Sequence, residues 1–229
     1  VCGIKLFMGS STGNMLVDKM NSLLNIFNGT DMLIAAHCED QETIKNNIEK
    51  YKQKYKGADD IPVSAHPSIR SVPACYASSE LAVRLAKIAG ARLHILHVST
   101  AKELQLFSDE PLASKNITAE ACVAHLLFTL THYNSLGTRI KCNPAVKRKT
   151  DREALRAAVN SGLIDVIATD HAPHLLNEKE GGALKAMSGM PMIQFSLVSM
   201  LELVDEGVFS LETVVQKMCH APARIYGIC

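Results

Sequence analysis

The chain has 229 residues, 47% of them hydrophobic, which is enough for the core of one large α/β domain or most of one. Its net charge of +1 and pI near 7.7 give no sign of a surface that binds nucleic acid. The longest apolar runs are far shorter than the roughly 20 residues that cross a membrane, and no secretory signal follows Val1. We therefore expect a cytoplasmic protein, and the missing initiator methionine suggests a fragment.

Seven cysteines are scattered along the chain, and none forms a C-x-x-C pair. The count is odd and the chain is not small, so a disulfide framework is not expected. Buried, reduced thiols in a cytosolic protein are the simpler interpretation.

Short apolar runs alternate with segments of helical periodicity. The runs predict strands around residues 3–7, 32–37, 92–98, 116–120 and 164–170, with 139–142 as a short extra strand. The periodic segments predict helices over about 16–27, 41–55, 78–89, 102–108, 121–130, 151–161, 192–204 and 211–220. Residues 57–76 are rich in glycine and proline and are expected to form a loop over one face. This alternation predicts right-handed βαβ units and a parallel sheet.

Several helix ends carry local signals. Ser78-Ser79-Glu80 is expected to open a helix that Gly90 ends, and Ser210 is expected to open the last helix. Thr150-Asp151-Arg152-Glu153 resembles a capping box.

The number of predicted strands leaves two sheet architectures open. Five strands are too few to close a (β/α)₈ barrel and would suit an open, doubly wound sheet. No G-x-G-x-x-G follows the first strand, so a dinucleotide site is not supported.

Four of the strand-like runs carry or end in a side chain capable of chemistry. The first contains Lys5, the second stops at His37, the third stops at His97, and the last ends at Asp170. Polar side chains at the carboxyl ends of barrel strands more often take part in catalysis or ligand binding than in stabilising the fold. Together these residues predict a metal centre, and nitrogen and oxygen ligands without a thiolate suit zinc, and equally manganese or nickel. Two such metals can activate a bridging hydroxide and polarise a carbonyl.

The histidines and the lysine also have simpler interpretations. A histidine at a strand end is often only structural, and His94 is a rival to His97. Side chains alternate across a strand, so we choose His97 and expect His94 to lie deeper and face the outer helices. Lys5 lies inside an apolar strand, where an unpaired ammonium is costly. It is expected either to reach solvent or pair with a carboxylate or, with a lowered pKa, to react as a neutral amine with CO₂ and give an anionic carbamate.

The remaining candidates are equally ambiguous from sequence. Asp170 could cap a helix, although His171 and His174 add more proton- and metal-handling groups than a cap needs. Glu120 is as compatible with an ion pair at a strand edge as with a site. Asn143 precedes a proline and is ordinarily a turn residue.

Six segments carry a resemblance to a known family. They are Gly-Ile-Lys-Leu-Phe-Met-Gly-Ser-Ser-Thr-Gly, Ala-Ala-His-Cys-Glu-Asp, Leu-His-Val-Ser-Thr, Ile-Thr-Ala-Glu-Ala-Cys-Val-Ala-His-Leu-Leu-Phe, Lys-Cys-Asn-Pro-Ala-Val-Lys and Ala-Thr-Asp-His-Ala-Pro-His, the last two being the most specific. They resemble the amidohydrolase superfamily and, within it, the dihydroorotases. The later His-Ala-Pro-Ala-Arg-Ile-Tyr-Gly is similar to the helix that ends that family's barrel.

The resemblance implies an α/β fold, a (β/α)₈ TIM barrel of the metal-dependent hydrolase type. Residues 1–229 would be one partial catalytic domain that holds strands 4–8 and their helices. Family members begin with a His-x-His strand, closely followed by an arginine, and add a small β domain. No His-x-His precedes Lys5, so part of the first-metal site is not in this sequence.

The resemblance also implies roles for matching positions. Two divalent metals, most simply zinc, would be bridged by Lys5 in N6-carboxylated form. His37 and His97 would bind the second metal, and Asp170 would bind the first and shuttle the proton. The substrate contacts would be Asn143, His174, Ser188 and Gly189, and the residues just outside the metal ligands would be Glu120 and His171.

The implied activity is the reversible interconversion of dihydroorotate and N-carbamoyl-L-aspartate in pyrimidine biosynthesis. The substrate would be a small molecule, with no nucleic acid or membrane as partner. A dihydropyrimidinase (hydantoinase) or allantoinase is the nearest alternative, because these enzymes share the metal ligands, and a barrel scaffold that has lost its metal is a third. The oligomeric state stays open, with a homodimer as one alternative, and exposed strand edges are expected to cause aggregation or dependence on a partner.

Overall fold

The computed structural model describes residues 1–9 and 15–228. Its centre is a five-stranded parallel sheet in which each strand pairs with the next along the chain. The strands are Ile4–Phe7 (β1), Ile34–His37 (β2), Leu93–Ile95 (β3), Ile117–Cys122 (β4) and Val166–Ala168 (β5). The order never reverses, as it would at the switch point of a doubly wound sheet, so the sheet is of the barrel type.

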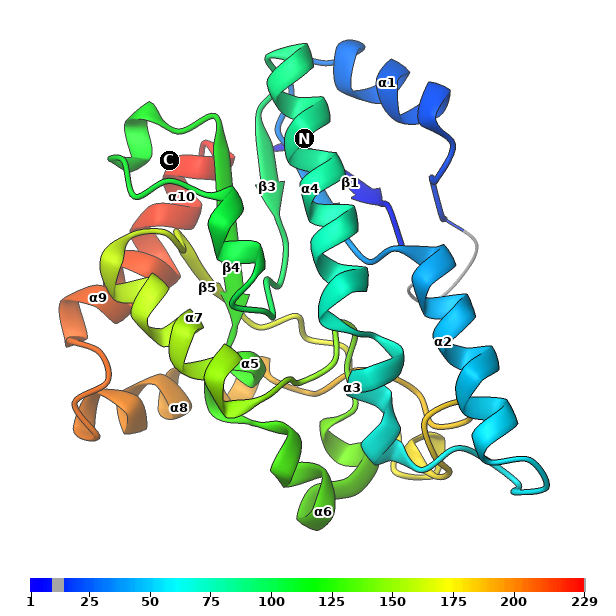
Figure 1. Ribbon diagram of the computed structural model, residues 1–229. Coiled ribbons are helices and arrows are strands. Elements are labelled where there is room, and N and C mark those ends of the chain that lie inside the picture. The colour runs from blue at the N-terminus through cyan, green and yellow to red at the C-terminus, as the bar shows by residue number, and fades with distance from the viewer. Residues whose placement is uncertain (10–14, 229) are drawn as a thin grey trace.

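α-Helices follow the strands, and the longest lies over the face of the sheet that is turned to the viewer in Figure 1. They are Met20–Asn28 (α1), Gln41–Lys54 (α2), His66–Ile69 (α3), Val72–Ala89 (α4), Val123–Leu127 (α5), Tyr133–Leu136 (α6), Lys149–Ser161 (α7), Ile193–Asp205 (α8), Leu211–Val215 (α9) and Ala221–Tyr226 (α10). The five predicted strands and the helices α2, α7 and α8 are confirmed. Among the described residues, no helix is long and apolar enough to cross a membrane.

Some predicted elements are wrong or displaced. The segment 139–142 is not a strand, because the 3₁₀ turn Gly137–Ile140 occupies most of it. The predicted loop 57–76 contains α3 and the start of α4, since its prolines occupy first helical turns, where the missing N–H is not needed. Residues 102–108 form only the 3₁₀ turn Glu103–Leu106. A π-helical turn, Gln216–His220, separates α9 from α10.

The helix ends show which local signals hold. Gly90 ends α4 with a φ of +66°, and the Ser210 hydroxyl accepts the Thr213 N–H at 3.1 Å, both as predicted. The predicted start at Ser78 is wrong, because both serines there lie buried inside α4. The capping box is also displaced: α7 begins at Lys149, and the Asp151 carboxylate accepts the Arg148 N–H at 3.2 Å.

The strand register decides which side chains face away from the helices. Lys5, Ala35, His94 and Thr118 share one row of the sheet and therefore one face. Their neighbours, including Ile95, point to the opposite face and into the main hydrophobic core under the helices. The expectation that His94 faces the helices is thus wrong. His97 lies beyond the end of β3, so the alternation of side chains along that strand does not determine the direction of its side chain.

The inward face of the sheet carries its own polar contacts. His94 Nδ1 lies 2.8 Å from the Thr118 hydroxyl, and His94 Nε2 lies 3.1 Å from a Glu120 carboxylate oxygen. The ring of Tyr226 on α10 meets the His94 ring edge-on, with centroids 5.8 Å apart. His94 is therefore a satisfied, buried histidine beneath the carboxyl edge of the sheet.

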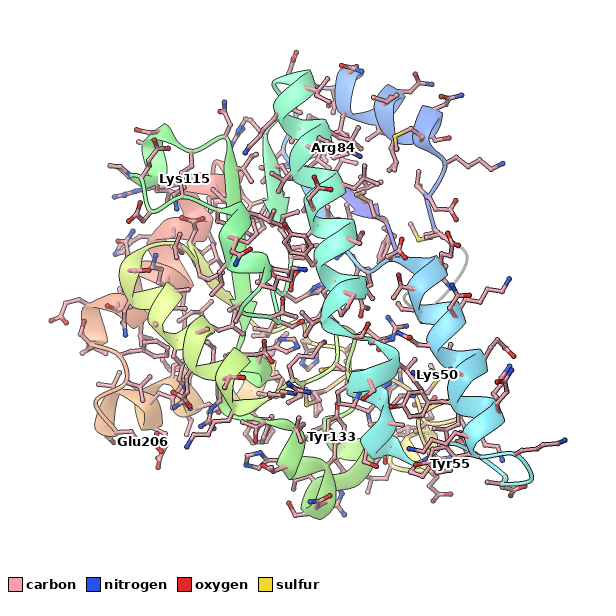
Figure 2. All side chains as sticks on the ribbon, in the orientation of Figure 1. Lys50, Tyr55, Arg84, Lys115, Tyr133 and Glu206 are labelled. Atoms are coloured by element: carbon pink, nitrogen blue, oxygen red, sulfur yellow. The ribbon has the colours of Figure 1, made fainter. Side chains whose placement is uncertain are left out.

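The loops that follow the strands, with α3, α5 and α6, gather at the lower end of the molecule in Figure 1. Lys115, which precedes β4, and Tyr133 on α6 mark opposite ends in Figure 2. The Ser10–Gly13 part of the segment that carries Lys5 lies outside the described residues, as does Cys229. Of the described cysteines, all are free thiols, and Cys38, Cys75, Cys122 and Cys142 are buried.

Candidate active site

Two buried imidazoles meet at the carboxyl edge of the sheet. His37 is the last residue of β2, and His97 follows β3. His37 Nδ1 and His97 Nε2 lie 2.9 Å apart and share a hydrogen bond, with the rings edge to face. The structure therefore brings together two of the predicted metal ligands, which lie 60 positions apart in the chain.

Two of the predicted site residues have unusual backbones. His97 has a φ of +40° and Asp170 a φ of +44°, and they are the non-glycine residues with positive φ among those described. Such a conformation costs about 1–3 kcal/mol and is found most often at functional sites. In each case the left-handed residue comes two positions after its strand ends and turns the chain across the carboxyl edge.

Lys5 is exposed, because β1 is an edge strand of the described sheet, so its side chain reaches solvent as the simpler alternative expected. Its ammonium lies 4.9 Å from the centre of the Phe7 ring. Nearby protein atoms still displace enough water to lower the pKa of Lys5, against the attraction of Asp170 and Glu120, which raises it. A lowered pKa favours the neutral amine, the form that can react with CO₂.

Asp170 follows β5 at the carboxyl edge of the sheet, whereas Lys5 lies within β1. The side chain of Asp170 is exposed, yet partial desolvation raises its pKa, and the Lys5 and His37 charges act in the opposite direction. Asp170 thus interacts electrostatically with both Lys5 and His37. A carboxylate with a raised pKa is suited to accepting and releasing a proton.

His97 is held in its neutral form. Burial lowers the pKa of His97 well below its usual value, and the neighbouring His37, Lys5 and His125 lower it further. Its Nδ1 is buried and has no hydrogen-bond partner among the described residues. A neutral imidazole is the form that binds a metal.

Glu39 is a residue of this site that the sequence analysis did not identify. It is fully buried two positions after His37, and its carboxylate lies 3.4 Å from His37 Nε2 and is ion-paired with Arg70. At this distance the contact is polar and longer than a usual hydrogen bond. Acidic partners of this kind orient metal-binding histidines. The acidic residue in the segment Ala-Ala-His-Cys-Glu-Asp was the available signal.

Glu120 and His171 differ in their surroundings. One Glu120 oxygen accepts the His97 N–H at 3.2 Å, while the other contacts His94, so Glu120 supports the left-handed turn at His97. His171 Nδ1 instead accepts the Ile193 N–H at 3.1 Å, at the start of α8. Of these two residues, therefore, only Glu120 directly contacts a candidate ligand.

Two buried histidines hydrogen-bond to the residues on either side of Asn143 in the chain. His66 Nε2 donates to the Cys142 carbonyl and His125 Nε2 to the Pro144 carbonyl, each at 2.9 Å. The Asn143–Pro144 peptide is cis, and Asn143 Oδ1 is buried with no hydrogen-bond partner in the part of the chain that the structure describes. An amide oxygen fixed in this way is available to a ligand.

The other predicted substrate contacts lie together in the loop after β5. His174 Nε2 donates to the Ser188 carbonyl at 3.2 Å. Gly189 has a φ of +148°, and a Cβ there would lie 2.4 Å from the Ala172 carbonyl oxygen. Only glycine fits at this position, so the sequence Ser-Gly packs closely against His174.

The arrangement of the candidate ligand atoms matches that of a metal site in part. Within residues 1–9 and 15–228, no three side chains of His, Cys, Asp or Glu are grouped closely enough to enclose one. However, two nitrogens on one tetrahedral zinc with bonds of 2.0–2.1 Å would lie about 3.3 Å apart. The 2.9 Å between His37 and His97 is close to that spacing, and the Asp170 carboxylate interacts electrostatically with Lys5 and His37. The roles of these residues as ligands stay predictions.

Comparison with known proteins adds evidence independent of this geometry. The sequence model of the amidohydrolase family matches residues 17–229. The dihydroorotase of Geobacter sulfurreducens is 31% identical over 211 residues, and that of Bacillus caldolyticus is 30% identical over 224 residues. These alignments cover 91% and 96% of the chain but 48% and 49% of the relatives, so the chain spans about half the length of the curated relatives it matches.

Solved structures of related enzymes share the fold of this chain. The L-hydantoinase (dihydropyrimidinase) from Arthrobacter aurescens superposes with a TM-score of 0.90 at 28% identity, over 99% of this chain and 51% of that one. A Saccharomyces cerevisiae dihydroorotase in complex with 5-fluoroorotic acid superposes with a TM-score of 0.78 at 17% identity, over 100% of this chain and 61% of that one, which is a likeness of fold.

Proposed function

The chain belongs to the amidohydrolase family, and from this we propose that it is part of a cyclic amide hydrolase that interconverts dihydroorotate and N-carbamoyl-L-aspartate. The strands β1–β5 would be strands 4–8 of an eight-stranded barrel, completed by ligands from outside residues 1–229. The observation that carries the proposal is the contact of His37 with His97, together with the electrostatic interaction of Asp170 with Lys5 and His37. The similarity to curated dihydroorotases supports this choice of substrate.

The metal-binding residues would be Lys5 after carboxylation, His37 through Nδ1, His97 through Nε2, and Asp170. Two divalent ions, with zinc as the first candidate, would supply activation of a water molecule and polarisation of the ring carbonyl. Burial keeps His97 neutral for this purpose, and the lowered pKa of Lys5 favours the amine that becomes carboxylated.

Asp170 would move the proton. As the water oxygen bonds to the ring carbonyl carbon, the carboxylate accepts the water's proton, and it then delivers that proton to the amide nitrogen as the C–N bond breaks. Asn143 and His174 would hold the ring and its carboxylate, and Ser188 and Gly189 would add contacts to the ring. Orientation of this kind can supply several kcal/mol of barrier reduction.

The mechanism predicts that Asp170→Asn lowers kcat/KM for dihydroorotate by about 10²–10⁴-fold in the full-length protein, because the amide cannot carry the proton. Asp205→Asn, at the exposed end of α8, is the matched control and should leave the rate unchanged. Turnover of the Asp170 variant near that of the control would show that Asp170 does not shuttle the proton.

A hydantoinase is the second candidate, because the superposition on the Arthrobacter aurescens enzyme has a TM-score of 0.90. The two activities differ in whether the substrate ring carries a carboxylate. A panel of dihydroorotate, dihydrouracil, hydantoin and allantoin, assayed with zinc present, separates them. Preference for dihydroorotate supports the proposal, and preference for a ring without a carboxylate replaces it with the second candidate. No turnover of any of the four by a protein with bound metal would overturn both.

A further inference from the structure

Lys179 is a buried ammonium whose contacts no step of the proposed reaction uses. Its side chain is 7% exposed, at the end of the 3₁₀ turn Asn177–Lys179. Its Nζ donates to the backbone carbonyls of Lys141 at 3.0 Å, Met187 at 2.8 Å and Gly189 at 2.8 Å. An ammonium has three N–H donors, so three carbonyls satisfy it completely.

These three carbonyls come from two separate segments of the chain. Met187 and Gly189 flank Ser188 in the loop after β5, whereas Lys141 lies two positions before Asn143. The same segments are joined directly by the Gly189 N–H, which donates to the Lys141 carbonyl at 2.8 Å. Lys179 therefore connects the segment of one predicted substrate contact to the loop of two others.

A second buried lysine reinforces this junction. Lys141 is 3% exposed, and its ammonium donates to the Ala186 carbonyl. The Met187 N–H donates to the Glu178 carbonyl at 2.9 Å, which closes the loop onto the turn that carries Lys179. Burying an ammonium is costly unless it is fully hydrogen-bonded, so a loop held in this way has one favoured conformation.

The upstream part of the same loop has a different anchor. The Asp60 carboxylate accepts N–H groups of Gly182 at 2.7 Å and of Lys185 at 3.1 Å. Lys185 itself is exposed, and its ammonium lies 3.8 Å from an Asp59 carboxylate oxygen. The loop thus contains one lysine that binds backbone carbonyls inside the protein and one that faces solvent.

We propose that Lys179 is a positioning residue for substrate binding, which fixes Ser188 and Gly189 relative to Asn143 through three backbone carbonyls. The proposal rests on the proposed function for the identity of the substrate. Burial lowers the pKa of Lys179 to about 8, so the ammonium form still predominates at neutral pH. Its three donors are all occupied, so Lys179 acts through the loop and does not touch the ring.

The test compares Lys179→Met with the control Lys185→Met in the full-length protein. Both changes remove one ammonium from the same loop and keep a flexible side chain of similar length. In Lys179→Met, the amides of residues 187–190 should exchange hydrogen about tenfold faster or more, while amides of α7 keep their wild-type protection. KM for dihydroorotate should rise about tenfold, with kcat within about threefold, because ground-state and transition-state binding are lost together.

The two readouts separate this inference from the proposed function. Faster exchange in a protein that turns over no cyclic amide would support the loop-fixing role and overturn the substrate. Unchanged exchange of residues 187–190 in folded Lys179→Met, or equal effects in Lys185→Met, would overturn the inference. If Lys179→Met does not fold, hydrogen exchange of the wild-type protein provides the test. A Gly189 amide that exchanges as fast as an unstructured peptide would contradict the proposed attachment of this loop to the Lys141 segment. A protected Gly189 amide would support that attachment.

Discussion

At the scale of single residues, the site depends on a carboxylate that no sequence motif assigns. Burial alone would raise the pKa of Glu39, but Arg70 and His37 lower it to about 2, so Glu39 is ionised at every pH at which the protein would work. Its negative charge faces His37 Nε2 and leaves Nδ1 directed at His97. Glu39 and Arg70 thereby orient one of the two contacting imidazoles.

Glu39→Gln is expected to weaken the binding of a divalent metal by about 10–100-fold, because the neutral amide no longer orients His37. Competition with a coloured chelator measures this affinity without any assay of turnover. Glu42→Gln, at an exposed position in the first turn of α2, is the control and should bind zinc like wild type. Equal affinities in the two variants would mean that Glu39 serves packing alone.

At the scale of structural elements, two histidines tie separate helices to the cis peptide segment. His66 begins α3 and His125 lies in α5, and both donate to carbonyls on either side of Asn143. Burial lowers the pKa of His66 to about 3 and that of His125 to about 4. Both folded values lie below the unfolded value of about 6.5, so the unfolded chain binds protons that the folded chain cannot.

Stability should therefore fall as the pH is lowered from about 6.5 toward 5, by roughly 1–2 kcal/mol for each histidine over that range. Urea unfolding between pH 7 and 5 measures the slope. His125→Gln keeps an N–H donor and should flatten the slope, whereas His220→Gln, at an exposed position, should not. An identical slope in both variants would show that His125 does not titrate with unfolding.

At the scale of the whole molecule, the described sheet is open at both ends. β1 and β5 each pair on one side only, and α8 presents apolar side chains to solvent, with Ile193 61%, Phe195 52%, Leu197 55% and Val198 67% exposed. Unpaired strand edges and apolar patches of this kind promote association. They are also the surfaces that further barrel strands and helices would cover.

The 229-residue chain by itself is expected to self-associate, and Phe195→Glu with Val198→Glu should reduce that association by charging the α8 surface. Sedimentation velocity measures the change. Asn46→Glu with Gln53→Glu adds the same charge to the exposed side of α2 and should have little effect. A monodisperse wild-type monomer with a cooperative melt would contradict this prediction.

The sequence by itself determined the local features of this protein. Alternating apolar runs and helical periods predicted the five parallel strands, because the strand and helix periods are properties of neighbouring residues. The runs also identified Lys5 within one strand and His37, His97 and Asp170 at the ends of others, and the short segments around them carried the family resemblance.

Only the tertiary structure decided the features that depend on partners far apart in the chain. The inward position of His94 follows from register with β4, the exposure of Lys5 from its edge strand, and the role of Glu39 from Arg70 on the segment after α3. Lys179 meets carbonyls at 141, 187 and 189. A buried charge needs particular neighbours, and those neighbours are set by how the chain folds back on itself, which no local pattern records.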